Sequence, residues 1–212
     1  MTELVFILDR SGSMQGLEQD TIGGFNSMIE EQKRSEGKVL VSTVLFSNQS
    51  RVLYDREPLD QVRAMTTADY RVGGGTALLD AVGEAIHHIG IVHKYARPED
   101  RPKKTMFVIT TDGMENASRR YNYERVKEMI RRQKEKYGWE FIFLGANIDA
   151  AAEAGRFGID PACAVNYNSD RAGTRISYAA VSAACTAFRA DAPMTTEWRA
   201  EVDRDFQKRG GR

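Results

Sequence analysis

Apolar runs that suit buried strands alternate with apolar stripes that suit helices along almost the whole chain. Residues 4–8 (Leu-Val-Phe-Ile-Leu) are continuously apolar, as expected for a central parallel strand that is buried on both faces. Residues 51–54 come after a polar turn and predict a short antiparallel edge strand. Similar strand-like runs occupy residues 39–46, 106–109, 141–144 and 162–165. The pattern predicts an α/β fold with a doubly wound, mostly parallel, Rossmann-like sheet of about six strands and helices on both faces.

The helical stripes lie between these strands and after the last of them. Apolar side chains recur at helical spacing on segments that begin near residues 22, 78, 126 and 178. Trp198, Val202 and Phe206 repeat this spacing beyond Pro193, and we expect them to form a short helix that docks on the body of the protein. We therefore assign residues 1–192 to one domain and residues 193–212 to a polar C-terminal tail.

Composition and charge narrow the classes of function. The 30 Lys and Arg residues balance the 30 Asp and Glu residues, so net charge favours neither nucleic acid nor an anionic membrane surface. No apolar run approaches the roughly 18 residues that a membrane-spanning helix needs, and no signal-peptide pattern precedes the first strand. Cys163 and Cys185 match no metal-ligand spacing. We expect a cytoplasmic protein that is monomeric when unliganded and has no nucleic-acid or membrane partner.

Oxygen-bearing side chains follow three segments that should meet at one edge of the sheet. They are Asp9, Ser11, Ser13, Thr76 and Asp112. The first three come directly after the first strand, the threonine follows the glycine run 73–75, and the second aspartate closes a later strand. Because the loops at the carboxyl ends of parallel strands gather at one edge, these side chains should converge. Their carboxylate and hydroxyl oxygens suit a hard cation, Mg²⁺ or Mn²⁺.

Each of these motifs by itself has a simpler explanation. Asp and Ser often cap helices, a glycine run before Thr is usually a loop, and Thr-Asp-Gly is usually a turn. The occurrence of all three at the same end of successive predicted strands favours a metal site. Burial of Asp9 and Asp112 close together would be costly without a cation, so we expect metal binding and fold stability to be linked.

The same segments resemble the metal-ion-dependent adhesion site of the von Willebrand factor type A (vWA) family. Residues 6–14 (Phe-Ile-Leu-Asp-Arg-Ser-Gly-Ser-Met) resemble its first motif, Gly75-Thr76 its second, and residues 109–113 (Ile-Thr-Thr-Asp-Gly) its third. The resemblance extends over residues 1 to about 190, fills all five ligand positions, and is to stand-alone intracellular bacterial members of the family.

The resemblance implies a role for each ligand position and for a partner. Ser11, Ser13 and Thr76 are expected to contact the metal directly, and Asp9 and Asp112 to contribute directly or through water. An Asp or Glu side chain of a partner protein is expected to complete the coordination. A metal held mostly by neutral hydroxyls would keep much of its charge for that carboxylate. We therefore expect a divalent-metal-dependent protein-binding module rather than an enzyme.

Two alternatives remain open at the level of sequence. One is a Mg²⁺-dependent phosphatase or hydrolase that uses Asp9. Phosphatases with an aspartate nucleophile carry an Asp-x-Asp motif, however, and this chain has Ser11 in place of the second aspartate. The other is a scaffold in which the metal serves stability alone. Residues on loops at the metal edge are candidate partner contacts, and two of them are arginines that could attract an acidic segment. These candidates are Met14, Gln15, Glu115, Asn116, Arg119, Arg120 and Asn147.

Overall fold

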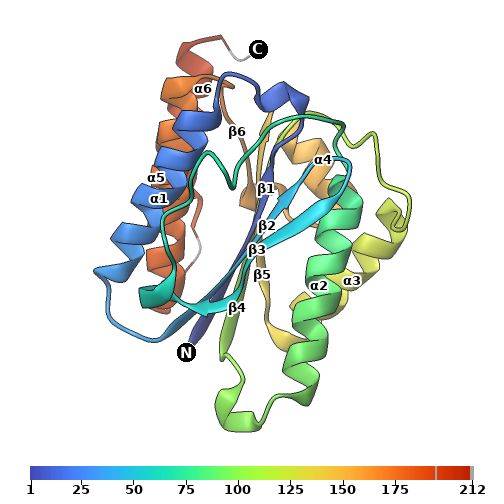
Figure 1. Cartoon of the computed structure of the whole chain (residues 1–212), viewed down its shortest axis with the longest axis vertical. Coiled ribbons are helices and arrows are strands. Elements are labelled where there is room, and N and C mark those ends of the chain that lie inside the picture. The colour runs from blue at the N-terminus through green and yellow to red at the C-terminus, as the bar shows by residue number, and fades with distance from the viewer. Residues whose placement is uncertain (194, 211–212) are drawn as a thin grey trace.

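A six-stranded sheet with strand order β3-β2-β1-β4-β5-β6 forms the centre of the computed structural model, which describes residues 1–193 and 195–210 (Figure 1). Its strands are β1 (Thr2–Asp9), β2 (Val39–Phe46), β3 (Ser50–Pro58), β4 (Lys104–Asp112), β5 (Glu140–Ala146) and β6 (Ala164–Asn166). All neighbouring strands pair in parallel except β2 and β3, which are antiparallel. The predicted fold class is therefore confirmed, including the antiparallel edge strand, although β3 is longer than the predicted residues 51–54.

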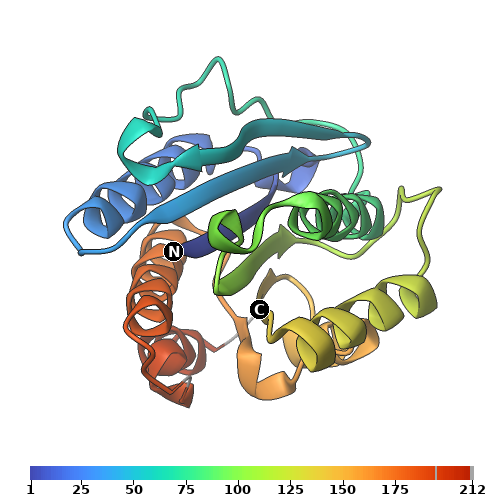
Figure 2. The same ribbon diagram turned by 90° about the horizontal axis from the view of Figure 1, so that it is seen from below.

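Helices cover both faces of this sheet (Figures 1 and 2). One face carries α1 (Glu18–Lys33), α5 (Arg171–Arg189) and α6 (Ala200–Lys208), and the other carries α2 (Leu78–Tyr95), α3 (Tyr123–Tyr137) and α4 (Ala150–Phe157). Short 3₁₀ turns connect the elements: η1 (Gly12–Met14), η2 (Leu59–Gln61), η3 (Pro98–Asp100), η4 (Pro161–Cys163) and η5 (Thr196–Arg199). None of the helices in the described part of the chain is long and apolar enough to cross a membrane.

The apolar run of β1 reflects the burial of both faces of the sheet under helices. Leu4, Phe6 and Leu8 pack in the core formed with α1 and α5, whereas Val5 and Ile7 pack in the core formed with α2 and α3. All five side chains are at most 1% exposed. Successive strand residues point to opposite faces, so a strand covered on both faces must be apolar at every position.

The structure differs from the sequence-based prediction between β5 and the end of β6. The short helix α4 was not predicted, because eight residues offer too few turns for a recognisable apolar stripe. Asp149 caps α4 by accepting a hydrogen bond from the Ala152 N–H, and Gly158 ends it in the left-handed conformation. The 3₁₀ turn η4 takes up residues 161–163, so the sixth strand begins only at Ala164.

The C-terminal segment packs against the same core. Val202 on α6 is 1% exposed, and Trp198 packs against the cluster that contains it. α6 contacts α5 and β6 and so lies against the body of the protein. Its assignment as a tail separate from residues 1–192 stays a prediction, and residues 194, 211 and 212 of that tail lie outside the described residues.

Candidate metal centre

Two loops meet where β1 ends, at the top of Figure 1. The Gly12 N–H donates to the Gly74 carbonyl at 3.0 Å, and the Gly73 N–H donates to the Arg10 carbonyl at 2.9 Å. Gly73 and Gly74 have φ angles of +148° and +83°, which non-glycine residues rarely adopt. A Cβ atom on Gly75 would lie 2.7 Å from Asn116 Oδ1. The glycine run therefore allows the loop that carries Thr76 to lie directly against the loop after β1.

Asp9 is the best-anchored member of the candidate site. It is 1% exposed, and its Oδ1 accepts a hydrogen bond from the Ser11 N–H at 2.7 Å. Its Oδ2 accepts hydrogen bonds from the Thr111 hydroxyl at 2.9 Å and from the Asp112 N–H at 3.0 Å. The Tyr70 hydroxyl donates to the carbonyl oxygen of Asp9. Asp9 thus joins the ends of β1 and β4, and Tyr70 fixes its backbone.

Ser11 and Ser13 present their hydroxyls side by side. The two Oγ atoms are 3.0 Å apart, and the Ser13 hydroxyl also donates to the carbonyl oxygen of Asp112. Mg²⁺ holds its oxygen ligands octahedrally at about 2.0–2.1 Å, so neighbouring ligands are separated by about 2.9 Å. The spacing of the two serine oxygens therefore suits two adjacent positions around such a cation.

Asp112 is also 1% exposed and lies beside Asp9. Its Oδ1 accepts a hydrogen bond from the Asn147 side-chain amide, and its Oδ2 accepts one from the Ser169 hydroxyl at 2.6 Å. Burial raises the pKa of the Asp112 carboxyl, the two hydrogen bonds oppose that rise, and the nearby charge of Asp9 adds to it. Among the described residues, no basic side chain forms an ion pair with either aspartate.

Thr76 is brought to the same edge by a pair of asparagines. The Asn116 side chain accepts a hydrogen bond from the Thr76 N–H at 2.8 Å, and the Asn116 N–H donates to the Thr76 carbonyl at 3.0 Å. Asn48 Oδ1 accepts a hydrogen bond from the Gly75 N–H at 2.6 Å. Thr76 itself is 4% exposed. Its backbone is therefore fixed from two loops, one after β2 and one after β4.

The donor set fits a hard cation. It combines three hydroxyls with two buried carboxylates, and such oxygens favour Mg²⁺ or Mn²⁺ over softer metals. Within the ranges that the structure describes, no group of three or more His, Cys, Asp or Glu side chains is placed to hold a metal ion. A metal at this edge would therefore depend on the hydroxyls of Ser11, Ser13 and Thr76.

The predicted partner contacts fall into different environments. Gln15, Asn116, Arg119 and Arg120 are exposed, whereas Met14 is buried and is not presented at the surface. Asn147 faces the Asp112 carboxylate instead of solvent alone.

Glu115 holds the backbone of its own loop and of a neighbouring helix. Its carboxylate accepts hydrogen bonds from the Leu79, Ala117 and Ser118 N–H groups and from the Ser118 hydroxyl. Glu115 therefore joins the start of α2 to the loop after β4.

Two contributors to the site were missed by the sequence-based reasoning. Tyr70 lies 61 positions from Asp9 in a segment without a recognisable motif, so no local signal identifies it. Ser169 lies in the polar run 168–170 after β6, and the topology that gathers the loops at one edge could have identified it. Its neighbours hold α6, because the Asn168 amide donates to the Asp205 carboxylate and Asp170 pairs with Arg209.

Comparison with solved structures places this architecture among vWA domains. A vWA protein from Catenulispora acidiphila is 15% identical, with a TM-score of 0.58 over 87% of this chain and 42% of its own. Proximal thread matrix protein 1 of the mussel byssus is 12% identical, with a TM-score of 0.57 over 87% of this chain and 46% of its own. This chain thus spans less than half the length of either protein. At these identities the likeness concerns the fold alone.

Two of the similar structures contain a metal. Plasmodium vivax TRAP, in a manganese-loaded form, is 16% identical, with a TM-score of 0.53 over 83% of this chain and 72% of its own. The mussel protein has also been solved with a zinc-occupied adhesion site, and that structure has a TM-score of 0.53 and 13% identity over 84% of this chain and 46% of its own.

Sequence comparison identifies the family more directly than the structures do. No curated protein matches the chain. The family model described as "VWA domain containing CoxE-like protein" matches residues 1–139, which include every candidate metal ligand. This match covers well over half of the 212 residues, and the chain belongs to the CoxE-like family of vWA-domain proteins.

Proposed function

We propose that this protein is a divalent-metal-dependent protein-binding module. Mg²⁺ or Mn²⁺ would be held by Asp9, Ser11, Ser13, Thr76 and Asp112, and would take a carboxylate from an Asp or Glu side chain of a partner protein. The observation that carries the proposal is the burial of two neighbouring carboxylates, neither of which forms an ion pair with a basic side chain among the described residues. Such a pair is costly to bury unless a cation joins it.

The division of the donors between neutral and charged groups supports recognition of a partner. Both oxygens of Asp9 accept hydrogen bonds from the chain itself, so this carboxylate chiefly organises the loops. The serine and threonine hydroxyls carry no charge. A cation that binds mainly to them keeps an electrostatic preference for an incoming anion. An acidic side chain of a partner protein is the ligand that best satisfies this preference.

The hydrolase alternative has less support. A nucleophilic carboxylate needs a free oxygen directed at the substrate, and hydrogen bonds from three donors hold the Asp9 oxygens. vWA domains are generally interaction modules rather than enzymes, in agreement with this arrangement. The scaffold alternative makes a different prediction from ours, because it requires metal-dependent stability without a metal-dependent partner.

A pull-down from a lysate of the source cell tests the proposal. The bait is the wild type in Mg²⁺, the wild type in EDTA, Asp112→Ala in Mg²⁺, and the exposed control Asp100→Ala in Mg²⁺. Circular dichroism checks that each bait is folded, and mass spectrometry identifies the bound proteins. We expect a protein that the wild type and Asp100→Ala retain in Mg²⁺, and that is retained neither by the wild type in EDTA nor by Asp112→Ala in Mg²⁺. Retention of the same proteins under all four conditions would contradict the proposal, and metal-dependent stability without such a protein would favour the scaffold.

A further inference from the structure

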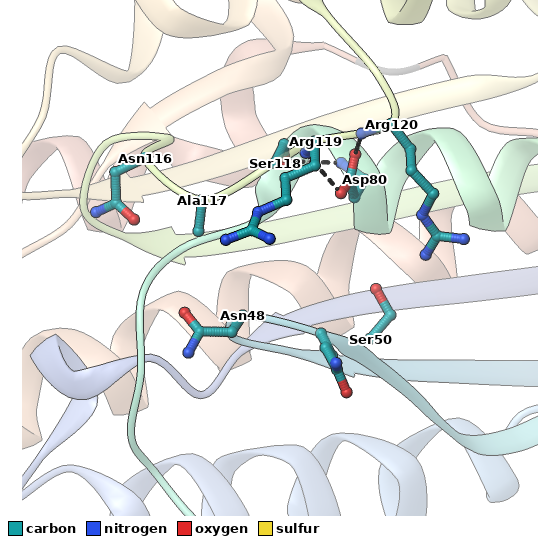
Figure 3. A pocket seen from close by; sticks show the side chains of 9 residues that line it. Asn48, Ser50, Asp80, Asn116, Ala117, Ser118, Arg119 and Arg120 are labelled. Carbon is teal, nitrogen blue, oxygen red and sulfur yellow. Dashed lines mark hydrogen bonds between the residues drawn. The ribbon is translucent and has the colours of Figure 1, made fainter.

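A polar pocket of about 810 Å³ lies beside the candidate metal centre (Figure 3). Residues 48–50, in the turn between β2 and β3, line one side of it, and residues 116–120, after β4, line the other. Most of these side chains are amides, hydroxyls or guanidinium groups. The pocket therefore offers several polar groups to an anionic ligand.

The pocket is continuous with the loop that carries a candidate metal ligand. Asn48 and Asn116 both line the pocket, and both hold the glycine loop through hydrogen bonds to the N–H groups of Gly75 and Thr76. A ligand that contacts these two asparagines is thus separated from Thr76 by a single layer of side chains. The pocket therefore lies within reach of a peptide bound at the metal.

Arg119 supplies a positive charge that the pocket does not neutralise. Arg120 pairs with Glu84, whereas no acidic side chain of the described residues forms an ion pair with Arg119. Asp80 also lines the pocket, but its carboxylate accepts hydrogen bonds from the N–H groups of Arg119, Arg120 and Tyr121, each at 2.9 Å. Figure 3 shows the bonds from Arg119 and Arg120, and it shows the Arg119 guanidinium extending into the space above Asn48.

Asp80 fixes the backbone of Arg119 but forms no ion pair with the Arg119 guanidinium in the described structure. Three backbone N–H groups stabilise the Asp80 carboxylate and fix the loop from which Arg119 projects. The guanidinium itself is exposed and offers parallel N–H donors that match a carboxylate in bidentate geometry. The neighbouring asparagine amides offer further donors to the same ligand.

We propose that this pocket binds a second acidic side chain of the same partner segment whose first carboxylate the metal takes. The inference rests on the proposed function and makes the partner more specific: an acidic stretch with two carboxylates a short, fixed number of residues apart. The metal selects the first acid, and Arg119, with Asn48 and Asn116, selects the second. Together they distinguish a doubly acidic segment from a protein that exposes a single Asp.

Selection from a displayed peptide library tests this inference without knowledge of the natural partner. Each peptide has a fixed central Asp and randomised residues on both sides. Wild type, Arg119→Ala and the exposed control Arg132→Ala, which lies on α3 away from the pocket, are used as baits in Mg²⁺ and in EDTA. We expect wild type and Arg132→Ala to enrich a second acid at one fixed offset in Mg²⁺. Arg119→Ala should still enrich metal-dependent peptides but without that preference.

Fluorescence anisotropy with one selected peptide gives the size of the effect. Loss of Arg119 should weaken binding of the doubly acidic peptide about fivefold, in the upper range for a partly exposed charge pair, and this difference should shrink at high salt. The same peptide with its second acid changed to Gln should bind wild type and Arg119→Ala equally. Equal binding of the doubly acidic peptide to both proteins would overturn the inference.

The outcomes separate the two proposals. Metal-dependent peptides without a preferred second acid would overturn the role of the pocket and leave the proposed function intact. An absence of any peptide retained in Mg²⁺ but released by EDTA would overturn the proposed function and this inference with it.

Discussion

The strand β1 carries a buried carboxylate near each end, and the protein treats the two differently. Glu3 is fully buried, with Arg56 Nε 2.7 Å from one of its oxygens and the His93 ring against the other. Asp9 is 1% exposed and is surrounded by hydrogen-bond donors and a second carboxylate, Asp112. The chain supplies its own counter-charge at the first end. Around Asp9 it supplies only uncharged hydrogen-bond donors, the N–H groups of Ser11 and Asp112 and the Thr111 hydroxyl.

This difference separates a charge that the fold neutralises from one that it leaves open to the proposed cation. Glu3 has a fixed set of partners, one from β3 and one from α2. Removing one partner of a buried ion pair strongly destabilises a protein, because the remaining charge is left buried and uncompensated. His93 is held further by the ring of Trp139, at 5.3 Å between centroids. At the other end the uncompensated charge of two aspartates remains available to a cation. The comparison predicts that loss of Glu3 costs the same stability at all metal concentrations, whereas loss of Asp112 removes the stability that metal adds.

Replacement of Glu3 should have the largest effect on the fold. Glu3→Ala leaves the Arg56 guanidinium and the His93 ring without their shared partner, and should lower the free energy of unfolding by about 3 kcal/mol. Urea unfolding in Mg²⁺ and in EDTA should give the same loss. The matched control Glu135→Ala removes an exposed pair with Arg131 and should cost no more than about 0.5 kcal/mol. A loss of unfolding free energy in Glu3→Ala that differed between Mg²⁺ and EDTA would contradict the assigned structural role of Glu3.

Replacement of Asp112 should remove most of the gain in stability that metal provides. A cation at 100 times its Kd raises the free energy of unfolding of the wild type by about 2.7 kcal/mol. Asp112→Asn removes one of the two buried charges that attract it, so most of this gain should disappear. Thermal unfolding with increasing Mg²⁺ measures the effect, and Asp100→Asn serves as the exposed control. An equal shift of Tm in wild type and Asp112→Asn would show that the metal binds elsewhere or not at all.

Removal of the Tyr70 hydroxyl should have a smaller effect that reaches both stability and metal affinity. Tyr70→Phe removes the hydrogen bond to the Asp9 carbonyl and should lower the free energy of unfolding by about 1 kcal/mol. Because the backbone of Asp9 is then less constrained, Mg²⁺ affinity measured by calorimetry should also fall. Tyr95→Phe, at a tyrosine that is 75% exposed, should change neither quantity. Unchanged affinity in Tyr70→Phe would limit this tyrosine to a purely structural role.

Acid should reveal the smallest effect, at a third carboxylate beside the site. Arg63 binds Asp69 in bidentate fashion at 2.7 Å per bond and holds the pKa of that carboxyl well below its usual range. A lowered folded-state pKa contributes stability that is complete above about pH 4 and declines as the pH falls towards the lowered value. Asp69→Asn should therefore cost less than about 1 kcal/mol at pH 7, because the Arg63 side chain is largely exposed.

Urea unfolding from pH 7 to pH 2 checks this dependence. The difference between wild type and Asp69→Asn should shrink below about pH 4. The exposed Asp60→Asn should track the wild type at every pH. A difference that grew on acidification would contradict the assigned ion pair.

Local patterns were sufficient for most of the fold and for the proximity of the candidate ligands. Strands such as residues 4–8 are recognisable from their continuous apolar character. Asp9, Thr76 and Asp112 lie next to turn motifs, and the topology of the sheet brings these turns together. The contacts of Tyr70 and Ser169 join positions 61 and 57 residues apart, respectively, and depend on packing that no local pattern encodes.

The Glu3 cluster was missed for a similar reason. It draws one partner from β3 and another from α2, and each looks like an ordinary polar residue in its own segment. Arg56 even has a positive φ of +52°, at an irregular stretch of the pairing between β2 and β3. The sequence thus predicted the location of the candidate oxygen ligands more readily than the residues that neutralise the buried charge of Glu3.

The run Asn168-Ser169-Asp170 gives the last helix a link to the candidate metal centre. Ser169 donates to the Asp112 carboxylate, while the residues on either side of it hold α6 through Asp205 and Arg209. Three consecutive residues therefore connect the position of α6 with the orientation of a candidate metal ligand. A fusion or tag that displaced α6 would also displace the Ser169 hydroxyl, so metal titrations depend on leaving this helix undisturbed.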